Sequence, residues 1–421
     1  MKLVHWVNGF WAVALIVLSQ GASARQHYDI TYLLDFSKKI GEVFVTIKVV
    51  QPQLVKSIDF NLRHTQCHDF QGAIKQTSSA HRLVWQPSSK QPDLNYICPI
   101  KHPRKSQHGE AFDAWWEDSY AIFRGDDLVP PARVVASKNA ESRARMAFKL
   151  PKQWPHVNTG WGKAEPERSL SSYNATFEIE NPDRKFDRPT GWMIVGDLGT
   201  RRDQLGTAHQ TQLAVSAPKI SRYSRMDALA FMGFAWPQIE LAFTPLPPKI
   251  LIVSADDPLW RGGLSASNSL FLHAQRPMIS ENATSTLLHE IVHVITRLRA
   301  NKQDDWIVEG IAEYYSSALL FRAGGITATR YQKVLANQKK RAGKNKDFRK
   351  QKSAFAVKAA AANFFYELNA SIRKNTKNTA SLDQVVQRLM QKRKIAGSDL
   401  IQAVTEVSPN SLVLFNRFEI N

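Results

Sequence analysis

Residues 285–299 read STLLHEIVHVITRLR, and this stretch carries the strongest structural signal in the sequence. Its apolar residues recur at the spacing of one helix face, namely at Leu288, Val292, Ile295 and Leu298. We therefore predict a single helix over residues 281–299. His289 and His293 are four residues apart, so both imidazoles lie on the same face of that helix, one turn above the other. Two imidazoles in this arrangement can bind one metal ion.

A second helix is predicted over residues 306–321, after a polar turn at residues 300–305. The turn lets this helix run back along the first one, so that Glu309 faces the two histidines. A catalytic zinc takes three protein ligands and leaves its fourth position to water, which makes Glu309 the third ligand of one zinc ion per chain. Glu290 is then placed to act as the general base that takes the proton of the attacking water. Glu313, one turn beyond Glu309, is placed to accept a hydrogen bond from a ligand histidine.

The five-residue pattern His-Glu-x-x-His also arises by chance, in a helix that has one buried and one exposed histidine. Three features favour the metal site over this alternative. The pattern lies in a helical segment, a Glu-Gly-x-Ala segment follows at residues 309–312, and the chain begins with the features of an export signal.

The export signal is predicted over residues 1–24. Lys2 supplies a positive charge, and residues 10–18 are almost wholly apolar but too short to span a bilayer. Ala22-Ser23-Ala24 fits the small-x-small pattern of a signal-peptidase site, so the mature chain is expected to start near Arg25. An uncleaved membrane anchor is the alternative, and it leaves the folded part on the same side of the membrane. The protein is therefore expected to be periplasmic or secreted.

The sequence contains only two cysteines, Cys67 and Cys98. Because a lone pair in an oxidising compartment usually forms a disulfide, we predict that they are bonded to each other. Two buried free thiols are the alternative. Neither cysteine lies in a Cys-x-x-Cys pattern, which argues against redox catalysis and against a thiolate zinc site.

The chain of 421 residues has a formal net charge of +19. An exported protein with this charge is attracted to anionic surfaces such as lipid headgroups or cell-wall polymers. Residues 339–352 hold eight basic residues and one acid, and they form either a solvated face or a docking surface for such polymers. No nucleic-acid-binding motif is present, so nucleic acid is not an expected partner.

Strands are predicted in the first half of the chain, separated by segments rich in Pro, Ser, Asn and Gly. Their positions are residues 42–50, 82–85, 146–150, 173–179, 192–195 and 211–217. Short strands without a long helical pattern indicate an antiparallel β-sandwich-like domain over residues 25–218. The pattern then changes to a helix at 221–235 and buried strands at 249–254 and 269–273, followed by mostly helical segments, so the fold class is α+β.

At the metal-site residues the sequence resembles the aminopeptidase-N-like zinc metallopeptidases, the gluzincins. In that family His-Glu-x-x-His is followed by a helix with Trp-x-x-Glu-Gly, and this sequence matches at His289, Glu290, His293, Trp306, Glu309 and Gly310. The resemblance implies hydrolysis of peptide bonds in a peptide or protein substrate. It also implies a thermolysin-like catalytic domain, over residues 219–345. The helical period of the segments that follow predicts a mainly helical C-terminal region over residues 346–421.

Two departures from the family concern the ligand spacing and the substrate. Fifteen residues separate His293 from Glu309, fewer than is usual in the family, and a shorter turn can absorb the difference. The family's Gly-x-Met-Glu-Asn segment reads Gly262-Gly263-Leu264-Ser265-Ala266. Gly262 and Gly263 are therefore candidate substrate-binding positions. Ser265 replaces the glutamate that binds the substrate's amine in the family, which argues against a strict aminopeptidase.

A third departure concerns stabilisation of the oxyanion. The family's Tyr-x-Lys-Gly pattern reads Ala356-Val357-Lys358-Ala359, so the tyrosine is replaced by alanine. Tyr366 is the candidate replacement, with Tyr331 as a second, although either can equally be a core or surface aromatic. Loss of one oxyanion donor lowers catalysis by roughly 10²–10³.

Three readings of the function follow. The first is an exported zinc metallopeptidase, with exopeptidase and endopeptidase action both open. The chain ends where the family's large C-terminal helical region would begin, and the resulting open cleft would suit internal bonds or a protein partner. The second is a zinc-binding, catalytically weak homologue that binds peptides or anionic cell-envelope polymers. The third is a metal-free scaffold, which requires the ligand pattern to be accidental.

Overall fold

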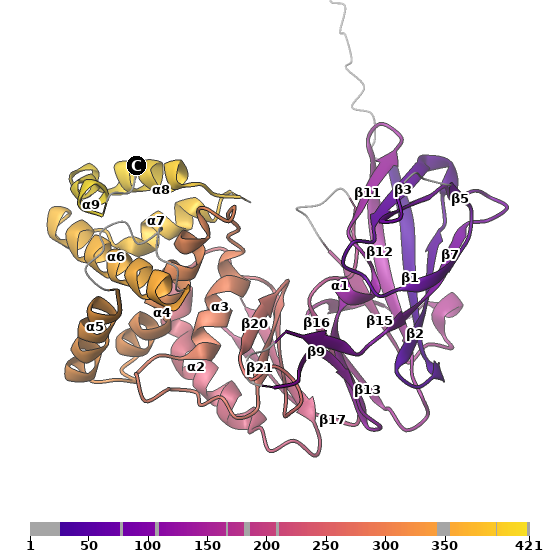
Figure 1. Ribbon diagram of the computed structural model, residues 1–421, viewed down its shortest axis with the longest axis horizontal. Coiled ribbons are helices and arrows are strands. Elements are labelled where there is room, and N and C mark those ends of the chain that lie inside the picture. Colours follow the sequence, from indigo (N-terminus) through magenta and orange to yellow (C-terminus); the bar gives the residue numbers. More distant parts are fainter. Residues whose placement is uncertain are drawn as a thin grey trace, which may run out of the picture.

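The computed structural model describes most of the chain, namely residues 26–75, 79–105, 109–165, 167–180, 186–207, 210–342, 354–392 and 394–418. The predicted signal peptide and its cleavage site lie outside the described residues, as does most of the basic stretch at 339–352. Strands gather on one side of the molecule and helices on the other, with a mixed region between them (Figure 1). This arrangement confirms the α+β class.

The N-terminal unit is built on a seven-stranded sheet in the order β14-β15-β12-β1-β2-β7-β4. Its strands are β1 (Gln26–Lys39), β2 (Glu42–Val49), β4 (His68–Gln71), β7 (Asp93–Pro99), β12 (Ala140–Lys149), β14 (Gly162–Lys163) and β15 (Ala175–Ile179). The pairs are antiparallel except β1 with β12, which is parallel. Side chains alternate between core and solvent along β1, which is the period-2 pattern of a sheet with one buried face.

Two smaller sheets complete this unit. One has the order β11-β3-β6-β5 and consists of β3 (Val55–Asn61), β5 (Ile74–Lys75), β6 (Arg82–Trp85) and β11 (Ala132–Ala136). The other has the order β13-β16-β10-β9-β8 and consists of β8 (His102–Arg104), β9 (Ala111–Trp116), β10 (Tyr120–Arg124), β13 (His156–Thr159) and β16 (Trp192–Gly196). A single turn of helix, α1 (Gly125–Leu128), follows β10. Cys67 and Cys98 are joined by a disulfide, as predicted.

The second unit has a five-stranded sheet in the order β17-β18-β19-β21-β20. Its strands are β17 (Leu198–Leu205), β18 (Thr211–Pro218), β19 (Lys249–Ala255), β20 (Gly263–Ala266) and β21 (Ser269–His273). The three inner strands are parallel to one another, and the two edge strands are antiparallel to their neighbours. Because β17 and β18 pair with β19, this sheet begins at Leu198 and not after the predicted boundary at residue 218.

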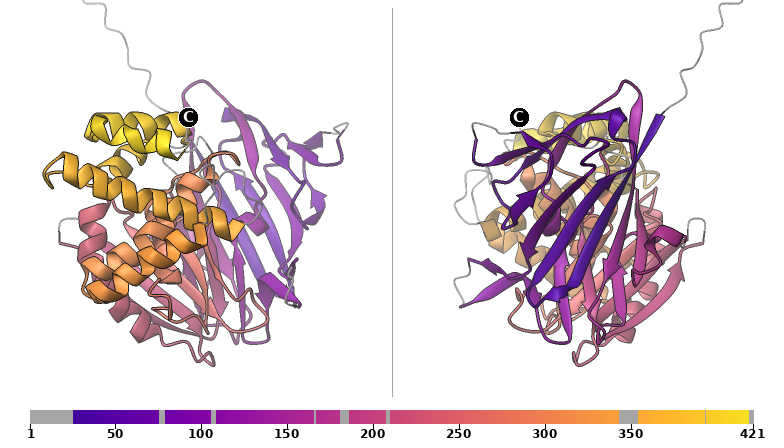
Figure 2. Two further views of the ribbon diagram at one scale, coloured as in Figure 1. Left: turned by 60° about the vertical axis from the view of Figure 1, so that its left-hand side comes forward. Right: turned by 90° about the vertical axis from the view of Figure 1, so that its right-hand side faces the viewer.

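Helices cover one face of the second sheet and extend away from it (Figure 2). They are α2 (Arg225–Ala242), α3 (Thr286–Thr296), α4 (Asp305–Arg322), α5 (Ala328–Ala342), α6 (Ala354–Asn375), α7 (Leu382–Leu389), α8 (Gly397–Val407) and α9 (Val413–Arg417). Buried residues of all of them belong to one hydrophobic core that also includes Ile250 and Ile252 of β19. Helices of the predicted C-terminal region, which starts at residue 346, therefore share one hydrophobic core with α3 and α4. None of the helices among the described residues is long and apolar enough to cross a membrane.

The other face of the second sheet packs against the N-terminal unit. Leu251 and Val253 of β19 and Phe271 of β21 share a buried cluster with Trp192 and Ile194 of β16. The indole nitrogen of Trp192 also donates a hydrogen bond to the Leu264 carbonyl of β20, at 2.8 Å. The two units are thus held together directly behind the edge strand that borders the metal-site helix.

Candidate metal centre

The helix that carries the two histidines is defined at both ends by local chemistry. Ser285 caps its N-terminus, because the hydroxyl oxygen accepts a hydrogen bond from the Leu288 amide at 3.2 Å. Arg297 ends it in the left-handed conformation, with φ of 52°. The helix therefore spans 286–296, several residues shorter at each end than the sequence predicted, and both histidines lie well inside it.

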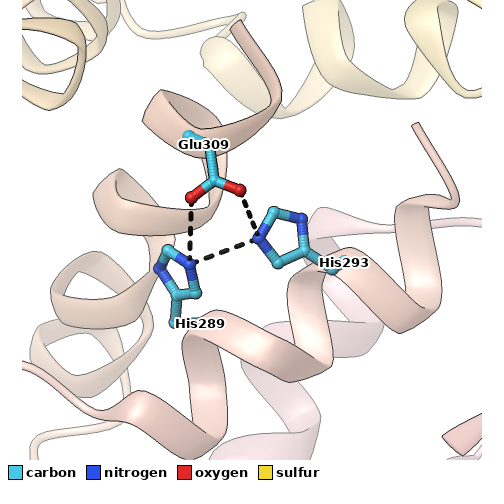
Figure 3. A group of neighbouring side chains, drawn as sticks. All are labelled: His289, His293 and Glu309. Atoms are coloured by element: carbon cyan, nitrogen blue, oxygen red, sulfur yellow. Dashed lines mark hydrogen bonds and ion pairs between the residues drawn. The ribbon is translucent and has the colours of Figure 1, made fainter. Parts of the chain in front are cut away.

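His289, His293 and Glu309 converge between α3 and α4 (Figure 3). The Nε2 atoms of the two histidines are 3.2 Å apart. One carboxylate oxygen of Glu309 lies 3.6 Å from Nε2 of His289, and the other lies 3.6 Å from Nε2 of His293. All three predicted ligands therefore point their ligating atoms at one another, and these atoms lie within 4.8 Å of each other.

The chemistry of this cluster fits a divalent metal ion. Two imidazole Nε2 atoms that face each other at hydrogen-bond distance can share at most one proton when both rings are neutral. The buried Oε2 atom of Glu309 accepts no hydrogen bond of regular geometry from the described residues, although an ammonium group lies beside it. Two nitrogens and one carboxylate that meet in this way are the ligand set of a catalytic zinc.

Glu313 and Gln338 fix the orientation of the first ligand. A carboxylate oxygen of Glu313 lies 3.4 Å from Nδ1 of His289, and the amide of Gln338 donates to the other oxygen at 3.0 Å. A proton held on Nδ1 leaves the lone pair of Nε2 facing the cluster, which is the tautomer that a metal requires. This is the contact that the sequence predicted for Glu313; Gln338 comes from α5 and was not predicted.

Lys358 is a second residue of this site to which the sequence analysis assigned no role. It lies on α6, and its ammonium nitrogen is 2.5 Å from Oε2 of Glu309. Its side chain is 43% exposed, although the oxygen that it contacts is buried. Lys358 therefore places a positive charge beside the third candidate ligand.

These contacts shift the pKa values of the ligands in the metal-free protein. Burial disfavours the charged form of His289, but its contacts with Glu309 and Glu313 raise its pKa to about 9. Burial and the charge of His289 lower the pKa of His293 to about 3. Burial opposes ionisation of Glu309, but the two histidines and Lys358 hold the pKa of its carboxyl well below the usual range.

Glu290 lies against the edge strand β20. A Cβ atom placed on Gly263 would lie 2.7 Å from Cγ and 2.9 Å from Oε1 of Glu290, which is closer than real Cβ atoms approach. Only glycine therefore allows the strand to pass this close to Glu290. Burial raises the pKa of the Glu290 carboxyl, while the charge of His289 and a hydrogen bond from Ser265 lower it. Ser265 thus borders the expected general base.

Gly262 and Gly263, both predicted near the substrate, have different surroundings. Gly262 lies in the turn before β20, where its amide donates to the Trp260 carbonyl at 2.8 Å and its carbonyl accepts from the His273 amide at 3.0 Å. The backbone polar groups of Gly262 are therefore used inside the hairpin. Of the two, Gly263 is the one that contacts Glu290.

Tyr366 does not reach the metal centre. Its hydroxyl group is hydrogen-bonded to the Ser317 hydroxyl and lies 3.4 Å from the Tyr314 carbonyl, inside the helical core. Tyr331 stacks on Phe321 with ring centroids 4.4 Å apart. This geometry corrects the predicted oxyanion role of Tyr366. Tyr366 lies eight residues beyond Lys358 on α6, about 12 Å further along the helix axis, and its hydroxyl faces Ser317 and not Glu309.

Comparison with known proteins agrees with the fold and the site. Residues 285–388 match the family model of the M61 glycyl aminopeptidases. No curated protein matches the sequence. The chain is similar in structure to an aminopeptidase N family protein from Idiomarina loihiensis, with TM-score 0.66, 16% identity, and coverage of 90% of this chain and 73% of that one. It is also similar to the M1 zinc metallopeptidase from Deinococcus radiodurans, with TM-score 0.60, 15% identity, and coverage of 93% and 92%.

The family match over the metal-site segment, together with the geometry of the ligands, defines the chain as a zinc peptidase. Its fold is that of the aminopeptidase-N-like gluzincins, which confirms the resemblance inferred from the sequence.

Proposed function

We propose that this protein hydrolyses peptide bonds with one zinc ion held by His289, His293 and Glu309, and with Glu290 as general base. The convergence of the three ligating groups within 4.8 Å is the observation that carries the proposal. Zinc held by these three residues would supply Lewis-acid chemistry at the scissile carbonyl and a lowered pKa for water. Glu290 takes the proton of the attacking water and passes it to the leaving amine.

The surroundings of Glu290 suit this role. Burial raises the pKa of its carboxyl, which makes the carboxylate a stronger base. The contact with Gly263 fixes its side chain between α3 and β20. Since β20 is an edge strand, an extended peptide can pair with its outer side and so pass in front of Glu290.

We also propose that cleavage does not depend on a free N-terminal amine. Ser265 occupies β20 where the family carries an amine-binding glutamate, and its hydroxyl interacts with Glu290 instead. A peptide library with free and with acetylated N-termini tests this. Equal cleavage of both sets is expected; cleavage confined to free N-termini would mean that another group binds the amine.

We propose further that the protein acts outside the cytoplasm, in the periplasm or as a secreted protein. The signal-like sequence at residues 1–24 and the disulfide between Cys67 and Cys98 support this location. Fractionation of cells that express the full chain, with N-terminal sequencing of the product, tests it. A processed product starting near Arg25 in the exported fraction is expected.

The central experiment measures zinc content and peptide turnover for the mature chain, for His289→Ala and for Glu290→Ala. About one zinc per chain is expected in the unaltered protein and in Glu290→Ala, and loss of zinc in His289→Ala. Turnover should be lost in both variants. Absence of zinc from the unaltered chain after the metal is added back would refute the proposal.

The same experiment tests a second candidate function for this protein. In that case the protein binds zinc, and it binds peptides or anionic cell-envelope polymers but catalyses little hydrolysis. The position of Lys358 beside Glu309 and the burial of Tyr366 favour this second function. The net charge of +19 would assist contact with anionic polymers. In that case zinc is bound, turnover is equally low with and without Glu290, and peptide binding survives Glu290→Ala.

A further inference from the structure

The junction between the two units contains two cationic side chains on the face of the second sheet that is remote from the metal centre. Arg202 of β17 is opposite Ala214 of β18, and Lys249 of β19 is opposite Gln212 of the same strand. Since alternate residues share a face, Lys249 lies on the same face as Leu251, which packs against the N-terminal unit. The helices that carry the metal ligands cover the opposite face.

A polar network connects these cations to the N-terminal unit. The guanidinium group of Arg202 donates to Oδ1 of Asn158 at 2.6 Å, and the Asn158 amide donates to the hydroxyls of Thr200 and Ser216, both at 3.1 Å. The ammonium group of Lys249 donates to the carbonyl of Trp161 at 2.5 Å. Every acceptor in this network is therefore neutral.

No carboxylate neutralises these charges in the part of the chain that the structure describes. Lys249 and Arg202 make no ion pair there. Lys163, an exposed residue of β14, adds a third positive charge nearby and also makes no ion pair among these residues. Burial, with smaller contributions from Arg202 and Lys163, lowers the pKa of Lys249 to about 8. Arg202 and Lys163 are exposed, whereas Lys249 is partly buried. A partly buried charge with further positive charges beside it and no opposite charge is destabilising, so the junction favours a bound counter-ion.

We propose that this junction is a binding site for a small tetrahedral oxyanion such as sulfate or phosphate. Lys249 and Arg202 hold the anion, and Lys163 lies at the rim. Cationic donors from both units suit an anion with several acceptor oxygens, because each oxygen can accept from a different side chain. The anion joins β14 of the N-terminal unit to β17 and β19 of the second sheet, and thereby fixes the two units to each other. The inference does not depend on the proposed peptidase activity.

Thermal unfolding of the full mature chain tests the site, with sodium sulfate compared with sodium chloride at equal ionic strength. Sulfate stabilises folded proteins in general, so the readout is the difference between the unaltered chain and its variants. At saturating sulfate the unaltered chain is expected to gain roughly 2–5 °C more in Tm than Lys249→Met gains. Lys249→Arg keeps the positive charge and should keep most of the response, and phosphate should act as sulfate does.

Lys56→Met is the matched control, because Lys56 is exposed on β3 and far in the chain from the junction. It removes one positive charge and should respond to sulfate as the unaltered chain does. If Lys249→Met fails to fold, Arg202→Gln provides the same comparison. An equal gain in Tm for the unaltered chain, the junction variants and Lys56→Met would overturn the proposal, since it would reveal a general salt effect only.

Discussion

The metal centre holds buried charged side chains, and the junction between the units holds the partly buried Lys249 beside the exposed Arg202, but the two sites neutralise these charges differently. At the metal centre Glu309 and Glu313 face His289, His293 and Lys358, so opposite charges are in contact before any metal binds. At the junction Lys249 and Arg202 face only neutral acceptors. Metal binding must therefore displace existing partners, whereas an anion at the junction would supply a missing one. The predictions below test this contrast, from the largest effect to the smallest.

Gly263→Ala should damage the metal centre without removing the metal. The new methyl group would overlap Cγ and Oε1 of Glu290, so this side chain, the proposed general base, must move from its position. We expect kcat/KM to fall by about 10²–10³, within the range for a displaced general base, while zinc content stays at one per chain.

The control is Gly233→Ala on α2, where the nearest heavy atom lies 4.0 Å from the added Cβ. Alanine replaces glycine inside a helix there, so activity should be unchanged and stability should rise by about 0.5–1 kcal/mol. If both variants kept full activity, Glu290 would not depend on its contact with β20.

Zinc affinity should rise with pH. In the metal-free protein His289 has a pKa of about 9, so it is protonated at neutral pH, and a metal must displace that proton. Below pH 9 the affinity should therefore increase about tenfold per pH unit, and it should level off above that pH. A competition titration with a zinc chelator at several pH values measures this. An affinity that does not change between pH 6 and 8 would mean that His289 is already neutral, contrary to its contacts with Glu309 and Glu313.

Lys358→Met should strengthen zinc binding modestly. The ammonium group lies 2.5 Å from Oε2 of Glu309 and competes with the metal for that carboxylate. The lysine is 43% exposed, so water screens its interaction with Glu309. We therefore expect the free energy of zinc binding to improve by about 1 kcal/mol, which is roughly a fivefold gain in affinity. Lys358→Arg, which keeps the charge, should show no gain. Weaker zinc binding in Lys358→Met would instead indicate that the lysine positions Glu309 for the metal.

Lys249→Met should stabilise the protein slightly when sulfate and phosphate are absent. The pKa of Lys249 is about 8 in the folded protein and 10.5 when unperturbed, so its destabilising effect is complete below pH 8 and disappears as pH rises toward 10.5. At pH 7 the free energy of unfolding of the variant should exceed that of the unaltered chain by about 1 kcal/mol. This difference in stability should shrink above pH 8. Urea unfolding at pH 7 and pH 10 measures this; a difference that grows with pH would contradict it.

Strands and helices with a clear apolar pattern were predictable. The strands at β6, β18, β19 and β21 lie within a residue or two of the expected positions, and α4 differs from its prediction by one residue at each end. β17 was not predicted, because it is an edge strand whose charged residues 201–203 face solvent and hide the alternation. β20 was not predicted, because its residues, Gly-Leu-Ser-Ala, include no β-branched or aromatic side chain that would indicate a strand.

The sequence by itself determined the candidate ligand set, because the periodicity of one helix brings His289 and His293 together, and a short turn into the next helix adds Glu309. It also indicated the role of Glu313, one turn further on. Only the tertiary structure decided that Lys358 reaches Glu309, that Tyr366 turns into the core, and that Gly263 confines Glu290. It alone brought Lys249 and Arg202 to the junction. These contacts join elements far apart in the chain, and their directions depend on how helices and sheets pack, which local periodicity does not encode.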